Sequence, residues 1–199
     1  MNEEDNKNPK IPQLFVQITG CYRNLAMEPQ QVELFIKEGA LVALSQMLNN
    51  FKDHKELVLN IVRILSKISL NYEALDVMNL LGEEFILTLK EIMIKNSDSN
   101  SILLRAAFVL GNLTTVYSES RISLLKEDKI FVNLFDLSHK LFDKDIGKKS
   151  TEGKKVDFNR DNTEDAVTKV VRLIANLLTE PQCQKLLNIN NKVDRFFRN

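Results

Sequence analysis

The chain has 199 residues, of which 44% are hydrophobic and 27% charged, so it has enough apolar surface to offset the chain entropy lost on folding. Its 27 basic and 27 acidic residues cancel, which disfavours nucleic acid and anionic membranes as partners. Six glycines are too few for the turns of an all-β sandwich, and two distant cysteines favour neither a disulfide framework nor a zinc site. Without a secretory signal or a long apolar run, the sequence predicts a soluble, helical, cytoplasmic protein.

Residues 1–12 are polar and predict a disordered or extended tail, whereas amphipathic helical patterns separated by turn residues fill most of residues 13–199. In chain order these segments are QITGCYRNLA, QQVELFIKEG, ALVALSQMLNN, NIVRILSKIS, YEALDVMNLLG, EEFILTLKEIMIKN, AAFVLGNLTT, SESRISLLKED, KIFVNLFDLSHKLF, KVVRLIANLL, QCQKLLNIN and NKVDRFFRN. Their number and length predict an all-α fold.

Four of these segments repeat one another. They align on an anchor column of Asn24, Lys67, Asn112 and Asn176, with spacings of 43, 45 and 64 residues. Apolar residues occupy the columns nine, three and two positions before the anchor and one position after it, offsets that place side chains on one helical face. The longer third spacing contains residues 143–163, a polar stretch with two glycines that predicts an insertion loop.

Two shorter patterns separate successive anchors, so each repeating unit is predicted to contain three helices. Gly39 and Gly82 fall between the first and second helices of their units, where a left-handed residue can end a helix. Asp53 stands three residues before Glu56 at the start of the next long helix, an arrangement typical of a capping box.

A three-helix unit of forty-odd residues with Asn near the end of its third helix resembles the armadillo repeat. The stretches CYRNLA, FVLGNLT and LIANLL resemble the end of that family's third helix, and IKEGALVALSQML resembles its turn and second helix. The resemblance implies a right-handed α-α superhelix, an armadillo-type solenoid, over residues 13–199, with about three complete repeats and partial repeats at both ends. HEAT repeats are the structural alternative, but they usually have two helices per unit.

The segment RAAFVLGNLT resembles, within this family, armadillo proteins of the ciliary axoneme that take part in radial spoke assembly. This resemblance implies a scaffold or adaptor of the cytoplasm, and more narrowly of the cilium and axoneme. Its partners would be other proteins within a larger complex. A transport or signalling adaptor that binds short peptides reversibly, as importins and catenins do, is the alternative function.

Catalysis finds no support in the sequence motifs. The chain has no nucleophile elbow, zinc-protease, P-loop or dinucleotide-binding motif. Its two histidines, His54 and His139, fall in different repeating units. We therefore predict a protein that is not an enzyme, with no catalytic residue, metal, cofactor or small-molecule substrate.

The third helices line the concave face of armadillo proteins, so the resemblance predicts a partner-binding groove from the exposed positions of these helices. The predicted groove residues are Asn24, Arg63, Lys67, Arg105, Phe108, Asn112, Lys169, Arg172 and Asn176. An Asn amide donates and accepts at once, so a ladder of them can hold the backbone of an extended peptide. Five cations on one face predict an acidic segment as the ligand. The alternative is that these cations pair with acidic groups of the same chain or are solvated.

The aromatic residues of the chain bear on this groove and on a second docking surface. Peptide-binding armadillo proteins place Trp four residues before the anchor Asn, and this chain contains no Trp, which disfavours recognition of import signals. Val193, Phe196 and Phe197 give the last segment an apolar side, which predicts a C-terminal docking surface. The alternative for these three residues is a frayed terminus with exposed aromatic rings.

Overall fold

The computed structural model describes residues 10–26, 28–127, 129–149, 163–181 and 183. Ten α-helices and no strand occur within this described part of the chain, which confirms the predicted all-α class. In chain order they are α1 (Lys10–Leu25), α2 (Pro29–Lys37), α3 (Ala40–Asn50), α4 (Lys55–Ile68), α5 (Tyr72–Leu80), α6 (Gly82–Lys95), α7 (Asn100–Val116), α8 (Ser118–Leu125), α9 (Ile130–Lys149) and α10 (Thr163–Leu178).

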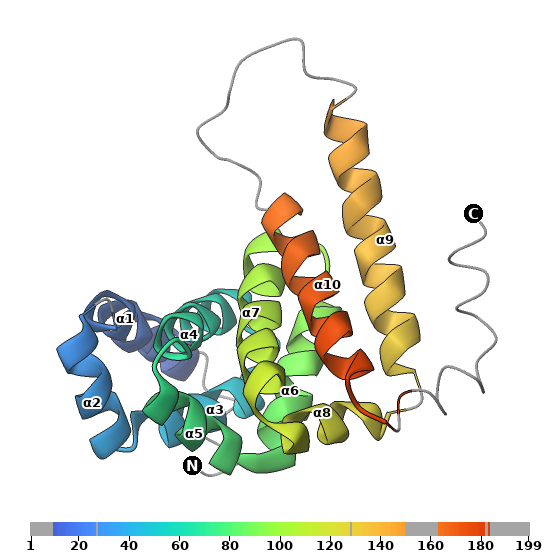
Figure 1. Cartoon of the computed structure of the whole chain (residues 1–199). Coiled ribbons are helices and arrows are strands. Elements are labelled where there is room, and N and C mark those ends of the chain that lie inside the picture. Colours follow the sequence, from blue (N-terminus) through green and yellow to red (C-terminus); the bar gives the residue numbers. More distant parts are fainter. Residues whose placement is uncertain (1–9, 27, 128, 150–162, 182, 184–199) are drawn as a thin grey trace.

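After α1, the helices group into three successive units of a short first helix, a second helix and a third helix: α2 to α4, α5 to α7 and α8 to α10. The third helices pack in series, with α1 on α4, α4 on α7, and α7 on α10 (Figure 1). First helix α2 packs on α5, and second helix α3 packs on α6. Units that contact their neighbours in chain order form a solenoid, so the armadillo-like architecture is confirmed.

The apolar columns of the sequence become the core of the array. The column three residues before the anchor is fully buried in α4, α7 and α10, where its residues are Ile64, Val109 and Leu173. The column one residue after the anchor is equally buried in these three helices: Ile68, Leu113 and Leu177. Each fully buried aliphatic side chain stabilises the fold by about 1.5–3 kcal/mol, so the repeat pattern directly defines what holds neighbouring units together.

Both predicted turn glycines adopt the left-handed conformation, with φ of 68° at Gly39 and 79° at Gly82. The cap of α4, however, differs from the prediction. His54 is the N-cap residue, and its Nδ1 accepts a hydrogen bond from the Leu57 N–H at 3.3 Å. Asp53 instead forms an ion pair with Lys95, because the start of α4 lies beside the end of α6 in the next unit.

Two boundaries also differ from the prediction. Helix α1 begins at Lys10, inside the predicted tail of residues 1–12, because a proline such as Pro12 is tolerated in the first helical turn. Helix α9 continues to Lys149, so residues 143–149 of the predicted insertion loop are helical. A polar sequence is compatible with a helix as well as with a loop. Residues 150–162 lie outside the described part of the chain.

Ion pairs between equivalent regions of neighbouring units recur on the surface. They join Lys52 to Glu91, Lys55 to Asp98, Lys95 to Asp53, and Lys126 to Glu83. Exposed pairs of this kind contribute about 0–1 kcal/mol each, so they favour one stacking register more than they stabilise the fold. Among the described residues no single helix is long and apolar enough to cross a membrane, and α7 with α8, which together reach the length, bend by 119° at their junction.

Candidate protein interface

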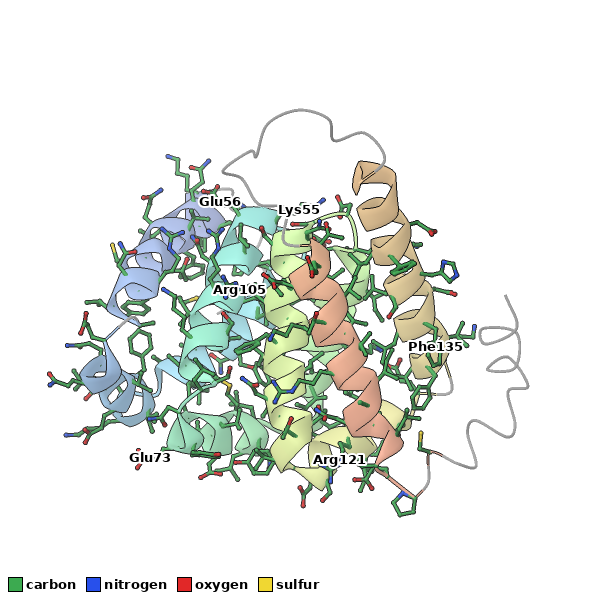
Figure 2. The ribbon with its side chains drawn as sticks, turned by 45° about the horizontal axis from the view of Figure 1, so that its top comes forward. Lys55, Glu56, Glu73, Arg105, Arg121 and Phe135 are labelled. Atoms are coloured by element: carbon green, nitrogen blue, oxygen red, sulfur yellow. The ribbon has the colours of Figure 1, made fainter. Side chains whose placement is uncertain are left out.

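The predicted groove residues all come from the four third helices, whose shared surface we call the third-helix face. Figure 2 shows α1, α4, α7 and α10 lying side by side, with Arg105 on the side of α7 that faces α4. The anchor column lies near the C-terminal end of each of these helices, where the last four backbone carbonyl groups of a helix have no intrahelical N–H partner. This placement brings side-chain donors close to backbone acceptors.

The anchor side chains tie each third helix to the one before it. Lys67 Nζ on α4 donates to the Arg23 carbonyl oxygen on α1 at 3.3 Å. Asn112 Nδ2 on α7 donates to Ser69 at the end of α4, at 3.0 Å to Oγ and 3.4 Å to the carbonyl oxygen. Only 7% of Asn112 is exposed. The anchors of α4 and α7 thus make the same kind of contact across successive junctions.

The α7–α10 junction repeats the arrangement. Asn176 Nδ2 lies 3.0 Å from each of three acceptors on α7, the Gly111 carbonyl oxygen and the hydroxyls of Thr114 and Thr115. The structure gives these amides a different role from the predicted ladder. The donors of Asn112 and Asn176 bond to the neighbouring third helix and are not presented to a peptide. Asn24, on α1, is the one anchor asparagine that is exposed.

Other predicted groove residues also connect α7 and α10. Arg172 donates through Nη1 to Asn112 Oδ1 at 3.3 Å and through Nη2 to Thr115 Oγ1 at 3.0 Å. The ammonium group of Lys169 lies 4.9 Å from the centroid of the Phe108 ring, a cation–π contact. These contacts hold Lys169, Phe108 and Arg172 in a group at the C-terminal half of the face.

The remaining cations converge from three helices into what we call the cationic cluster: Arg23 on α1, Arg63 and Lys67 on α4, and Arg105 on α7. Partial burial lowers the pKa of Arg63, and repulsion from Arg23 and Arg105 lowers it further. Burial likewise lowers the pKa of Lys67, with added repulsion from Arg105, Arg23 and Arg63. Four positive charges therefore lie within electrostatic reach of one another.

The alternative reading, in which these cations pair with acidic groups of the same chain, finds no such pair for the guanidinium groups of this cluster among the described residues. Within the described residues, Arg63 and Arg105 form no ion pair with a carboxylate. Arg23 donates from Nη1 to the side-chain oxygen of Asn60 at 3.2 Å, and the Asn60 amide in turn donates to the Val16 carbonyl oxygen. An anion placed among these cations would relieve their repulsion.

Arg23 is the member of the cluster that sequence reasoning missed. It stands one position before the anchor of α1, where the other third helices carry the small residues Ser66, Gly111 and Ala175. The groove prediction used only the anchor and the columns four and seven positions before it. The sequence nevertheless contained a signal for Arg23. It is the one cation in a column of small residues, and that column lies next to the columns of Arg63, Lys67 and Arg105.

The rest of the described chain offers a groove as a further candidate site. A groove of about 590 Å³ between α1 and the start of α4 is lined by Gln13, Gln17, His54 and Glu56, among others, and Figure 2 shows Glu56 at that end of the face. No group of three or more His, Cys, Asp or Glu residues that could hold a metal ion occurs in the described ranges. The predicted docking residues Val193, Phe196 and Phe197 lie outside the described residues.

Three-helix units in series, with third helices forming one shared face, define an armadillo-like solenoid, a class whose members serve in general as scaffolds for protein–protein interaction. Comparison with known proteins agrees with this class. The chain is similar to armadillo repeat-containing protein 2 of Bos taurus, with 28% identity over 189 residues and 91% of the chain covered. It is also similar to the proteins of that name from Homo sapiens, at 26% identity over 92% of the chain, and Mus musculus, at 24% over 97%.

These similarities confirm the resemblance to armadillo repeat proteins that the sequence motifs indicate. The chain spans only 22–23% of the length of these curated relatives. No family model matches the chain, and no solved structure matches it significantly. The comparisons thus support a protein-interaction scaffold in general terms.

Proposed function

We propose that the chain is a non-catalytic scaffold whose cationic cluster binds an acidic segment of a partner protein. The observation that carries the proposal is the convergence of four cations from α1, α4 and α7, with no carboxylate of the described residues paired to Arg63 or Arg105. Guanidinium groups hold carboxylates through two parallel donors, and these bonds are about twice as strong as bonds between neutral groups.

The geometry of the third helices suggests the spacing of acidic groups in such a segment. Packed helices lie about 8–10 Å apart, and an extended chain advances about 3.3 Å per residue. Acidic residues two or three positions apart would therefore meet cations on adjacent helices. Recognition would depend on side chains, because the Asn112 and Asn176 amide donors are already engaged between helices.

A direct binding test uses a fluorescein-labelled peptide with glutamate at every second position, compared with the same peptide carrying glutamine. Fluorescence anisotropy of the full chain should show affinity for the glutamate peptide that falls as salt is raised. Arg63→Glu with Arg105→Glu should weaken binding at least tenfold and flatten its salt dependence. Lys37→Glu, which changes an exposed cation on α2, is the matched control. Equal binding by the double variant and the wild type would exclude the cluster as the site.

A reversible peptide adaptor of the importin or catenin type is the alternative function. That mode uses free anchor amides and a Trp four positions before them. Here the column four positions before the anchor contains Gly20, Arg63, Phe108 and Arg172, and the chain has no Trp. Tight binding of the glutamine peptide, unaffected by salt, would favour this alternative over the acidic-segment model.

We also propose a cytoplasmic location, within the cilium, in assembly or structure of the axoneme and its radial spokes. The support is the similarity to armadillo repeat-containing protein 2 together with the resemblance of RAAFVLGNLT to axonemal armadillo proteins. Imaging of the tagged chain in ciliated cells, followed by electron cryotomography after its depletion, tests this setting. Intact radial spokes in depleted cells, with the tagged chain absent from cilia, would contradict it.

A further inference from the structure

Helix α10, the last third helix of the described residues, presents one side of a junction between units. The positions one before and two after the anchor face the next third helix, since Gly111 and Thr114 of α7 accept hydrogen bonds from α10. These positions are buried in α4 and α7, as is the position five before the anchor. The buried residues are Val62, Ser66, Ser69, Ala107, Gly111 and Thr114.

In α10 the same three positions are exposed. They are Val171, Ala175 and Leu178, which we call the α10 edge, and the exposed fractions of Val171 and Leu178 are 50% and 46%. The spacing of four and three residues places all three on one side of the helix. The α10 edge is therefore an apolar stripe at the positions that face the next third helix in α4 and α7, where the residues are smaller or polar.

The first third helix presents the opposite side of such a junction. The anchor of each later third helix donates to the helix before it, and among the described residues no third helix precedes α1. Its corresponding residues, Gln17, Gly20, Asn24 and Leu25, form what we call the α1 edge. Leu25 is 47% exposed, Asn24 and Gln17 are also exposed, and open space surrounds the position of a Gly20 Cβ atom.

The two edges also match in part of their hydrogen bonding. In the α7–α10 junction, Asn176 donates to the Gly111 carbonyl oxygen, one position before the anchor, and to the Thr115 hydroxyl, three positions after it. The equivalent residues here are Ala175 in α10 and Thr179 directly after its end, and both are exposed. Two of the three acceptors that Asn176 uses thus have equivalents at the end of α10, and the third, the Thr114 hydroxyl, is replaced by Leu178.

We propose that a second copy of the chain docks head to tail, with its α1 edge on the α10 edge of the first. Asn24 of one copy would donate to the Ala175 carbonyl oxygen and the Thr179 hydroxyl of the other, which continues the interface already present between α7 and α10. The α1 edge suits this position electrostatically. Its residues four and seven positions before the anchor, Gly20 and Gln17, are uncharged. They therefore add no positive charge that would repel Arg172 of α10.

Head-to-tail docking is heterologous, so each added copy leaves one edge of each kind open. The proposed contact is mainly one helix side on another, so we expect it to bury less than the roughly 1,600 Å² typical of stable complexes. Association should therefore be reversible and should increase with concentration. It should also produce species larger than dimers.

The test is sedimentation velocity of the full chain from micromolar to millimolar concentration, with circular dichroism to verify that each variant is folded. One variant carries Val171→Glu and Leu178→Glu on the α10 edge. A second carries Asn24→Asp and Leu25→Glu on the α1 edge, which replaces the donor by an acceptor. Leu80→Glu is the matched control, because Leu80 is 82% exposed on α5, away from both edges.

Wild type and the control should associate beyond dimers as concentration rises, and each edge variant alone should associate at least tenfold more weakly. An equimolar mixture of the two edge variants should form dimers and nothing larger, because it contains one intact edge of each kind. A monomeric wild type at every concentration overturns the proposal. So does wild-type association by either edge variant alone, or a mixture that stays monomeric.

Discussion

Replacing the buried anchor asparagine distinguishes a residue that ties helices together from one that binds a partner. Asn112→Ala removes the donor to Ser69 and the acceptor of the 3.3 Å bond from Arg172. One buried hydrogen bond contributes about 0.5–1.5 kcal/mol, and a charge-assisted bond about 1.5–3 kcal/mol. Arg172 is exposed, so its bond belongs at the low end of that range. We expect the free energy of unfolding to fall by about 2–3 kcal/mol.

Urea denaturation measures this loss directly, and calorimetry should show a melting temperature lower by roughly 4–12 °C for a chain of this size. Asn24→Ala is the matched control, because Asn24 occupies the same column but is exposed, and it should change stability by no more than about 0.5 kcal/mol. Equal effects of the two substitutions would refute the reasoning. So would an Asn112→Ala protein of wild-type stability, which would return Asn112 to the list of residues available to a ligand.

Further predictions concern individual groups. Burial raises the pKa of Tyr117 to about 12, with a further contribution from the bond to Asp76, so the neutral phenol favours the folded state and its contribution to stability should be lost as pH rises from 10 to 12. Spectrophotometric titration should show a lower Tyr117 pKa in Asp76→Asn. Gly39→Ala should cost about 1–2 kcal/mol of unfolding free energy, because φ is 68° there. Arg105→Gln should raise the pKa of Lys67, measurable by NMR, because it removes a nearby positive charge.

The fold could be predicted from the sequence because it depends on local periodicity. Apolar columns at helical spacing identify the buried side of each third helix, and they became the core at residues such as Ile64 and Leu113. Gly39 and Gly82 also follow from a local requirement, the left-handed turn. The predicted boundary was wrong at residues 143–149, because polar composition does not distinguish a loop from a helix.

The candidate site depended on distances between helices, which one sequence does not supply. The column of Asn112 and Asn176 was found, but whether their amides reach the neighbouring helix or point to solvent is decided by how closely third helices approach. The cap at His54 shows the same limit, because Asp53 is drawn to Lys95 of another unit. Arg23 was missed for a different reason: it interrupts a column of small residues, so a search for repeated features passes over it.

The ties between helices also explain why the cationic cluster exists as a unit. Lys67 donates to the Arg23 carbonyl oxygen, and this bond holds its ammonium group close to the guanidinium groups that repel it. At the position of Arg23, the next two third helices have the uncharged and buried Ser66 and Gly111. A face that served only to stack helices would gain nothing from four like charges held together. Their repulsion opposes folding in the free protein and would be relieved by a bound anion, which is the arrangement expected if the proposed binding site is correct.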